Sequence, residues 1–210
     1  MNKTVYKAGY RAGLLAFLST TAYCIVQLLQ IWGAFSYPLD DILIYGFSLC
    51  IVIPFIIEIL ALHYITPEDK KFWSHAALIF TTIYSVFVTA NYVVQLATVI
   101  PMSLKGTADE IRILNQTPHS LFWDFDALGY IFMGFTTFAA IPAFEKHGFQ
   151  GKVRTFFLLN GLVTPLIAFV YFYPDFSANL LYIGLPWVIT APGSMLMLAI
   201  MFKRQLRSIK

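Results

Sequence analysis

Residues 42–64, ILIYGFSLCIVIPFIIEILALHY, form an apolar stretch in which Glu58 is the only Asp, Glu, Lys or Arg. A helix needs roughly 20 apolar residues to cross about 30 Å of hydrocarbon, so this stretch predicts a transmembrane helix. The rest of the chain holds further stretches of the same character, which gives six expected spans. Their bounds are 12–34, 42–64, 73–101, 120–143, 153–173 and 179–202.

The composition of the whole chain agrees with this prediction. Apolar residues make up 59% of the 210 residues, and charged residues make up 12%, whereas a typical soluble domain has about 25% charged residues. No polar stretch is long enough for a separate soluble domain, so residues 1–210 are predicted to form a single all-α transmembrane domain in a lipid bilayer. The formal charge of +3 is too small to indicate a nucleic-acid partner. A homo-oligomer is left open.

The basic residues predict which way the spans run. Loops that stay in the cytoplasm carry an excess of Lys and Arg. Twelve of the 14 Lys and Arg residues fall on one side of the predicted topology, and two, Lys105 and Arg112, fall on the other. We therefore expect both termini to be cytoplasmic. In general character the chain resembles small multi-pass proteins of bacterial inner membranes, and we expect that location. The twelve are Lys3, Lys7, Arg11, Lys70, Lys71, Lys146, Lys152, Arg154, Lys203, Arg204, Arg207 and Lys210.

The loop between the third and fourth spans contains the sequence GTADEIRIL. Thr107 and Glu110 have the spacing of a capping box, in which each side chain satisfies a backbone N–H at the start of a helix. The spacing predicts a short surface helix over residues 107–114.

The fourth span begins SLFWDFDALGY and carries two aspartates that helical geometry separates. At about 100° per residue, positions two apart point to nearly opposite faces. Asp124 lies near Ser120 and Trp123, in the first turn, where a carboxylate is favoured by the helix dipole. Asp126 shares its face with small and polar residues, a pattern typical of helix contacts inside a membrane bundle. Asp126 is therefore the candidate functional residue, because an ionisable side chain inside a membrane is costly.

Two other spans carry polar stripes at a matching depth. Gln27 and Gln30 lie in the outer half of the first span, and Asn91 and Gln95 lie in the outer half of the third. Together with Asp126 and Tyr130, these residues predict a polar chamber that opens towards the outside. The alternative is that the same side chains only form hydrogen bonds between packed helices, which is common in membrane proteins.

Two further features could contribute to a site. Glu58 lies about one turn after Pro54 in the inner half of the second span, and it is a second candidate ligand-binding residue. A polar pocket there could include Asn160 and Thr164, with His63 and His75 within reach. Pro186 and Pro192-Gly193 interrupt the sixth span near mid-membrane, where broken helices often line transporter sites.

These observations favour binding or transport of a small molecule or ion in a pocket centred on Asp126. Asp126 would change protonation, while Gln27, Asn91, Gln95 and Tyr130 would supply neutral hydrogen bonds. One alternative is a membrane enzyme, of the isomerase or cyclase type, that uses Asp126 or Glu58 as acid or base on a lipophilic substrate. Another is a structural or regulatory subunit. No metal or cofactor motif is present in the sequence, and we expect neither.

Overall fold

The computed structural model describes residues 3–208, and all regular structure within that range is helical. Six helical segments are long and apolar enough to cross a membrane. The expected spans are confirmed as helices, and most helices extend beyond the apolar core predicted for them. Their bounds are Lys3–Ile31 (α1), Leu39–Ile65 (α2), Glu68–Leu104 (η1, α3, η2 and α4), Leu121–Ala143 (α5 and η4), Gly148–Phe172 (α6) and Ala178–Ser208 (η5 and α7).

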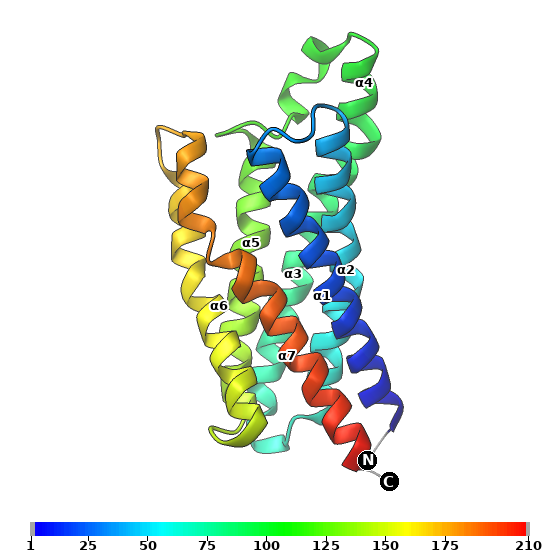
Figure 1. The fold of residues 1–210 in the computed structure, drawn as a ribbon, viewed down its shortest axis with the longest axis vertical. Helices are drawn as coiled ribbons and strands as arrows, with labels where there is room; N and C mark the ends of the chain where they lie inside the picture. The colour runs from blue at the N-terminus through cyan, green and yellow to red at the C-terminus, as the bar shows by residue number, and fades with distance from the viewer. Residues whose placement is uncertain (1–2, 209–210) are drawn as a thin grey trace.

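The six segments form a closed ring, in which each helix packs mainly against two neighbours. The order around the ring is α1, α2, α3, α5, α6 and α7, with α7 returning to α1. Figure 1 shows α7 crossing the front of the bundle between α6 and α1. A ring of this kind encloses a core along its axis, and buried aromatic, aliphatic and small polar side chains occupy that core.

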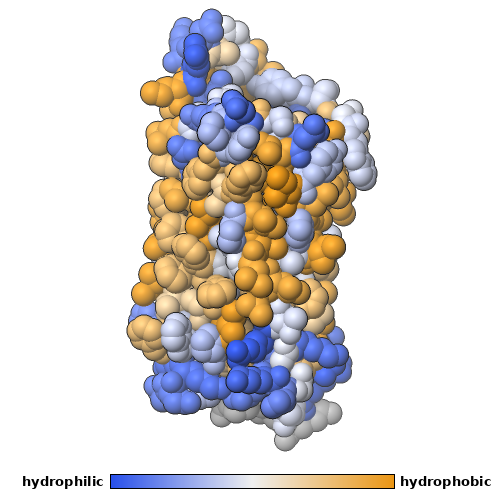
Figure 2. Space-filling view, turned by 90° about the vertical axis from the view of Figure 1, so that its left-hand side faces the viewer, coloured by the Kyte–Doolittle hydropathy of each residue, from blue (hydrophilic) through white to orange (hydrophobic). Residues whose placement is uncertain are grey.

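On the face shown in Figure 2, apolar residues cover most of the middle of the molecule, and polar residues gather at both ends. Large exposed apolar side chains such as Leu18, Ile53 and Leu162 belong to this outer surface. Exposed apolar area on this scale marks a membrane-facing surface. The distribution therefore supports a multi-pass membrane protein.

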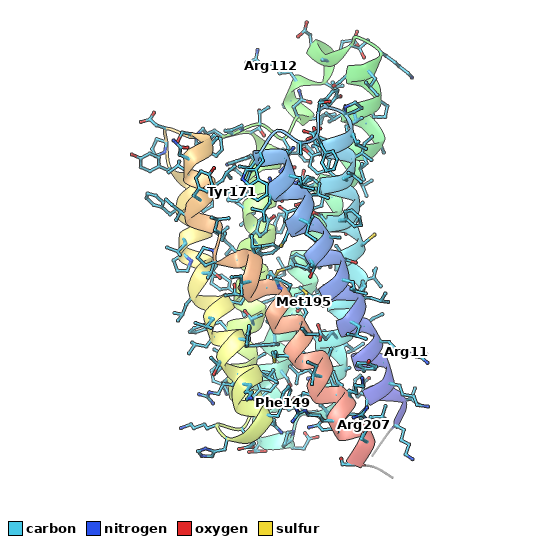
Figure 3. The ribbon with its side chains drawn as sticks, viewed as in Figure 1. Arg11, Arg112, Phe149, Tyr171, Met195 and Arg207 are labelled. Atoms are coloured by element: carbon cyan, nitrogen blue, oxygen red, sulfur yellow. The ribbon has the colours of Figure 1, made fainter. Side chains whose placement is uncertain are left out.

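The two ends differ in charge. We call the end where α1 begins and α7 ends the basic end, and the opposite end, which carries α4, the loop end (Figure 1). Arg11 and Arg207 lie at the basic end, and Arg112 lies at the loop end (Figure 3). Lys70 and Glu145 form an ion pair of 2.5 Å between two basic-end loops. The hydrogen bond from Lys70 lowers the pKa of the Glu145 carboxyl.

Two of the six segments are interrupted along their length. The third contains a π-helical turn, η2 (Gln95–Val99), just before Pro101. Because Pro101 has no N–H to donate, one backbone hydrogen bond is missing at this point, and the segment continues as α4 (Ile100–Leu104). The sixth consists of a 3-10 helix, η5 (Ala178–Gly184), followed after Leu185 and Pro186 by α7 (Trp187–Ser208). Figure 1 shows this break at mid-height. Pro192 lies inside a continuous α7, so the break is at Pro186 alone and not at Pro192-Gly193.

The predicted surface helix is present as a 3-10 helix, η3 (Ala108–Leu114), which lies at the loop end. The predicted capping box is wrong. The Thr107 hydroxyl donates to the Met102 carbonyl at 3.0 Å, and no side chain caps the helix. The Ile111 side chain is buried, which anchors η3 on the bundle.

Candidate functional site

The two aspartates of α5 (Leu121–Ala140) lie in opposite environments, as helical phase predicts. Ser120 caps the helix by accepting a hydrogen bond from the Trp123 N–H at 3.2 Å. Asp124 follows in the first turn and is exposed, whereas Asp126 is 4% exposed and points into the ring. At 1.5 Å per residue, Asp126 lies about 8 Å along the axis from Leu121.

Three neutral side chains donate hydrogen bonds to the Asp126 carboxyl group. The Tyr92 hydroxyl, from α3 (Lys71–Val94), donates to Oδ1. The Tyr171 hydroxyl, from α6, donates to Oδ2 at 2.5 Å, and the Gln116 amide donates to the same oxygen at 3.0 Å. Hydrogen bonds to an ionised acceptor are the stronger kind. Asp126 therefore joins α3, α5, α6 and the loop after η3 at one point.

A second layer of amides holds Gln116 in place. Asn91 Nδ2 donates to Gln116 Oε1 at 2.9 Å, and the Gln116 backbone N–H donates to Gln95 Oε1 at 3.3 Å. Gln95 Nε2 in turn donates to the Leu114 carbonyl at 2.8 Å. Gln95 begins the π-turn η2, and such turns often occur at functional sites. Asn91 and Gln95, both expected in the predicted polar chamber, thus connect to Asp126 through Gln116.

A cavity adjoins Asp126 inside the ring. The volume in it that a water molecule can occupy is about 20 Å³, and we call it the aromatic chamber because four tyrosines and a tryptophan line it together with Asp126. Trp187 reaches it because α7 begins at mid-depth, directly after the break. Tyr171 lies beside the chamber in the loop-end half of the bundle (Figure 3). The five aromatic residues are Tyr23, Tyr84, Tyr92, Tyr130 and Trp187.

A chain of hydrogen bonds leads from the aromatic chamber towards the loop end. The Tyr130 and Tyr23 hydroxyls share a hydrogen bond, and Tyr23 also donates to Gln27 Oε1 at 2.9 Å. Gln27 donates to Gln30 at 3.0 Å, and Gln30 donates to Asp40 at 3.0 Å. The predicted site residues Gln27, Gln30 and Tyr130 therefore belong to one connected network.

A second cavity lies next to the aromatic chamber and shares Tyr23, Tyr130 and Trp187 with it. The volume in it that a water molecule can occupy is about 90 Å³, and we call it the apolar cavity. Gln27 and the Tyr171 ring contribute to its wall. Most of its remaining wall is aliphatic, from residues that include Leu28, Ile31, Ile167, Val170, Leu185 and Val188.

Glu58 is not part of this site. It lies seven residues before the basic end of α2, about 10 Å along the axis from Ile65. Its side chain is fully buried, and neither carboxyl oxygen has a hydrogen-bond partner in the part of the chain that the structure describes. A Cβ at Gly13 of α1 would meet Glu58 Oε1, and Ala199 of α7 lies beside the same point. Glu58 therefore occupies a tight contact of three helices.

The polar pocket expected around Glu58 does not form. Asn160 donates to the Thr137 hydroxyl at 3.2 Å and accepts from Thr190 at 3.1 Å, which joins α5, α6 and α7. Thr164 packs against Gly134 of α5. Asn160 and Thr164 thus face neighbouring helices and not Glu58. Small residues such as Gly134 let those helices approach closely.

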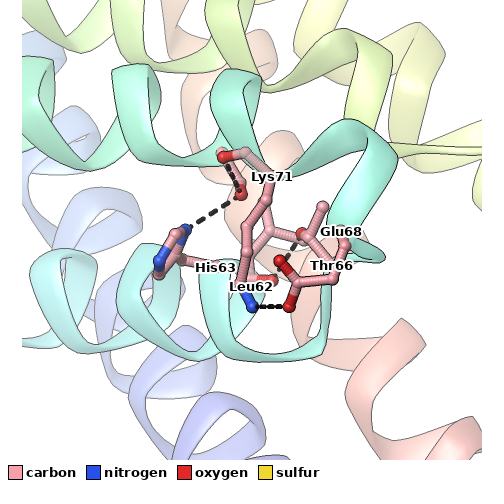
Figure 4. Close-up of polar contacts among 6 residues, drawn as sticks. Leu62, His63, Thr66, Glu68 and Lys71 are labelled. Carbon is pink, nitrogen blue, oxygen red and sulfur yellow. Dashed lines mark hydrogen bonds and ion pairs between the residues drawn. The ribbon is translucent and has the colours of Figure 1, made fainter.

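The two histidines expected near Glu58 lie on either side of the turn between α2 and α3, His63 in the last turn of α2 and His75 near the start of α3. The His63 ring shares a hydrogen bond of 3.0 Å with the Ser74 hydroxyl, and its centroid lies 5.4 Å from that of His75. Figure 4 shows the same turn, with Thr66 donating to the Leu62 carbonyl at 2.7 Å and Lys71 paired with Glu68. These contacts stabilise a turn at the basic end.

Several residues of the site were not predicted from the sequence. Tyr92 is three residues before Gln95, so the stripe that contains Asn91 and Gln95 also contained the signal for Tyr92. Tyr171 carried no such signal, because its place in the ring depends on how α6 packs. Gln116 lies in a loop segment after η3, where no helical period applies.

No protein-family model, curated protein or solved structure matches the chain. The chemistry of the site therefore has to be argued from its own residues. It combines one buried carboxyl group, neutral hydrogen-bond donors and an aromatic wall around empty space. Such a site can hold a small ligand that is polar or positively charged.

Proposed function

We propose that this chain is a multi-pass membrane protein that binds a small molecule or ion at Asp126 and transports it across the membrane. The observation that carries the proposal is a buried carboxyl group that lines a cavity inside the ring. Ionisable groups at this depth are expensive, and they usually mark a pathway for a ligand or ion.

The arrangement supports distinct roles for the site residues. Asp126 would change its protonation state. Tyr130 and Gln27 would supply neutral hydrogen bonds towards the loop end. Asn91 and Gln95 would act as positioning residues through Gln116. The helix break at Pro186, next to Trp187, supports transport, because interrupted helices tolerate movement beside a central site.

The basic residues support an orientation for this site. Twelve Lys and Arg residues against two favour a cytoplasmic basic end. The aromatic chamber would then lie closer to the outer surface, and the η3 loop would face outwards. A bacterial cytoplasmic membrane is the location that we propose.

Native mass spectrometry of gently solubilised protein tests the proposal. Wild type should retain a small molecule, and Asp126→Asn, which keeps the shape but removes the charge, should lose it. Asp124→Asn is the matched control, since it makes the same chemical change two residues away on the exposed face. It should behave like wild type.

Equally bare spectra for wild type and Asp126→Asn would contradict the proposal, provided that both proteins remain folded. In that case a structural or regulatory role would be favoured. Retention of the same molecule by all three proteins would place the ligand elsewhere. Intact melting curves for each variant show whether loss of ligand reflects the site or loss of the fold.

A further inference from the structure

Among the described residues 3–208, no cationic side chain pairs with the Asp126 carboxyl group. Its three donors, Tyr92, Tyr171 and Gln116, are all neutral. Within residues 3–208 the salt bridges involve Glu68 and Glu145, both at the basic end. A buried charge is usually paired, because an isolated one is costly in a medium of low dielectric constant. The partner of Asp126 is therefore expected to come from the ligand.

The surroundings of the carboxyl group also suit a cation. The aromatic chamber is walled by the rings of four tyrosines and Trp187. The Trp187 ring centroid lies 5.0 Å from that of Tyr130 and 5.7 Å from that of Tyr23, with the rings nearly perpendicular. Aromatic rings attract organic cations through their quadrupoles, and cages of this kind recognise quaternary ammonium groups. An anion would be repelled by the Asp126 carboxylate and by the negative faces of the aromatic rings.

The apolar cavity indicates what is attached to the cation. It shares Tyr23, Tyr130 and Trp187 with the aromatic chamber, so these three side chains border both spaces, and a ligand that displaces them can occupy both. Its wall comes from α1, α5, α6, η5 and α7 and is mainly aliphatic. An alkyl group placed there would be removed from water, which is favourable in proportion to its apolar area.

We propose that the ligand is an amphipathic organic cation, with an ammonium group in the aromatic chamber and an apolar body in the apolar cavity. The ammonium group would neutralise Asp126 without breaking the hydrogen bonds that hold the carboxyl group. The apolar body would lie between α1 and α6, beside the helix break. This inference rests on the proposed function, because it names the ligand class of the same site.

Thermal unfolding of the purified protein in lipid nanodiscs tests the ligand class. The probe is hexyltrimethylammonium, compared with 1-hexanol, which is neutral, and hexyl sulfate, which is anionic. A ligand that binds only the folded state raises the unfolding midpoint. The cation should raise it by several degrees in wild type and in Asp124→Asn, but not in Asp126→Asn. Tetramethylammonium, which lacks the apolar body, should give a smaller shift.

Three results would overturn the inference. One is an equal shift with hexanol and the cation, another is a full shift in Asp126→Asn, and the third is no shift with any cation. If Asp126→Asn is too unstable to compare, Trp187→Leu replaces it and should reduce the shift with the cation. A failure of this inference can be told apart from a failure of the proposed function. A molecule retained by wild type and lost from Asp126→Asn, together with no response to cations, would keep the site and reject the ligand class.

Discussion

At the scale of single residues, helical phase was sufficient to separate Asp124 from Asp126. The two carboxyl groups are two positions apart, and the structure exposes one and buries the other. Phase alone could not identify the donors to Asp126. Tyr171 reaches it from α6 and Gln116 from a loop, and neither contact follows from a period within one segment. Contacts between elements depend on packing, which a single sequence does not encode locally.

Tyr171 gives a direct test of the hydrogen bonds around Asp126. Tyr171→Phe removes a donor from a buried carboxyl group and should lower the free energy of unfolding by about 1.5–3 kcal/mol. Tyr173→Phe, which alters an exposed tyrosine two residues away, is the control and should have little effect. Chemical denaturation in mild detergent measures both. Equal stabilities for the two variants would show that the bond to Asp126 contributes nothing.

Gly13 gives a second test, at the contact with Glu58. A Cβ at Gly13 would meet Glu58 Oε1 and would lie 2.8 Å from the Ala199 Cβ. Gly13→Ala should therefore destabilise the fold by about 1–3 kcal/mol through overpacking. Combining it with Glu58→Ala should cost less than the sum of the two single changes, because the truncated side chain makes room. Strict additivity in a double-mutant cycle would argue against this contact.

At the scale of elements, hydropathy located all six spans but underestimated the length of several helices. Helix α1 begins at Lys3, before the expected 12, and α7 ends at Ser208, beyond the expected 202. Hydropathy reports only the part of a helix that lies in hydrocarbon, whereas the hydrogen-bonded helix continues into polar surroundings. The π-turn at Gln95 and the break at Pro186 needed the structure, because a proline can also lie within a continuous helix. Pro192 does so in α7.

The break before α7 should be visible in amide hydrogen exchange. Around Pro186 the backbone changes from η5 to α7. In the first turn of α7, the Thr190 backbone N–H donates a hydrogen bond to the Pro186 carbonyl at 3.0 Å. Amides of residues 184–188 should exchange at least about tenfold faster than those of residues 195–202, since local opening needs fewer broken bonds. Equal protection across both segments would contradict a hinge at this position.

At the scale of the whole molecule, the charge asymmetry predicts the direction of insertion. The basic end should be cytoplasmic and the loop end should face outwards. A fluorescent reporter fused after residue 210 should therefore be active in the cytoplasm, and a phosphatase reporter inserted at Gly106 should be active outside. Gly106 has a positive φ in a turn and no neighbour near its Cβ position, so an insertion there should be tolerated. The opposite pattern of reporter activity would reverse the topology.

The ring of six segments also explains why the site needs the entire chain. Asp126 contacts α3, α6 and the loop after η3, while α1 and α7 contribute Tyr23 and Trp187 to the chamber. These residues therefore come from five of the six segments and from one loop. We infer that a fragment lacking one span would lose the chamber, even where the remaining helices still insert.

The central claim is that the space beside Asp126 is a ligand site, and an experimental density map of gently purified protein tests it most directly. The account predicts non-protein density in the aromatic chamber, in contact with Asp126 and Trp187 and continuing into the apolar cavity. The same map for Asp126→Asn should lack it. A wild-type chamber that is closed by its own side chains, with no density beside Asp126, would contradict the account and assign these residues to packing.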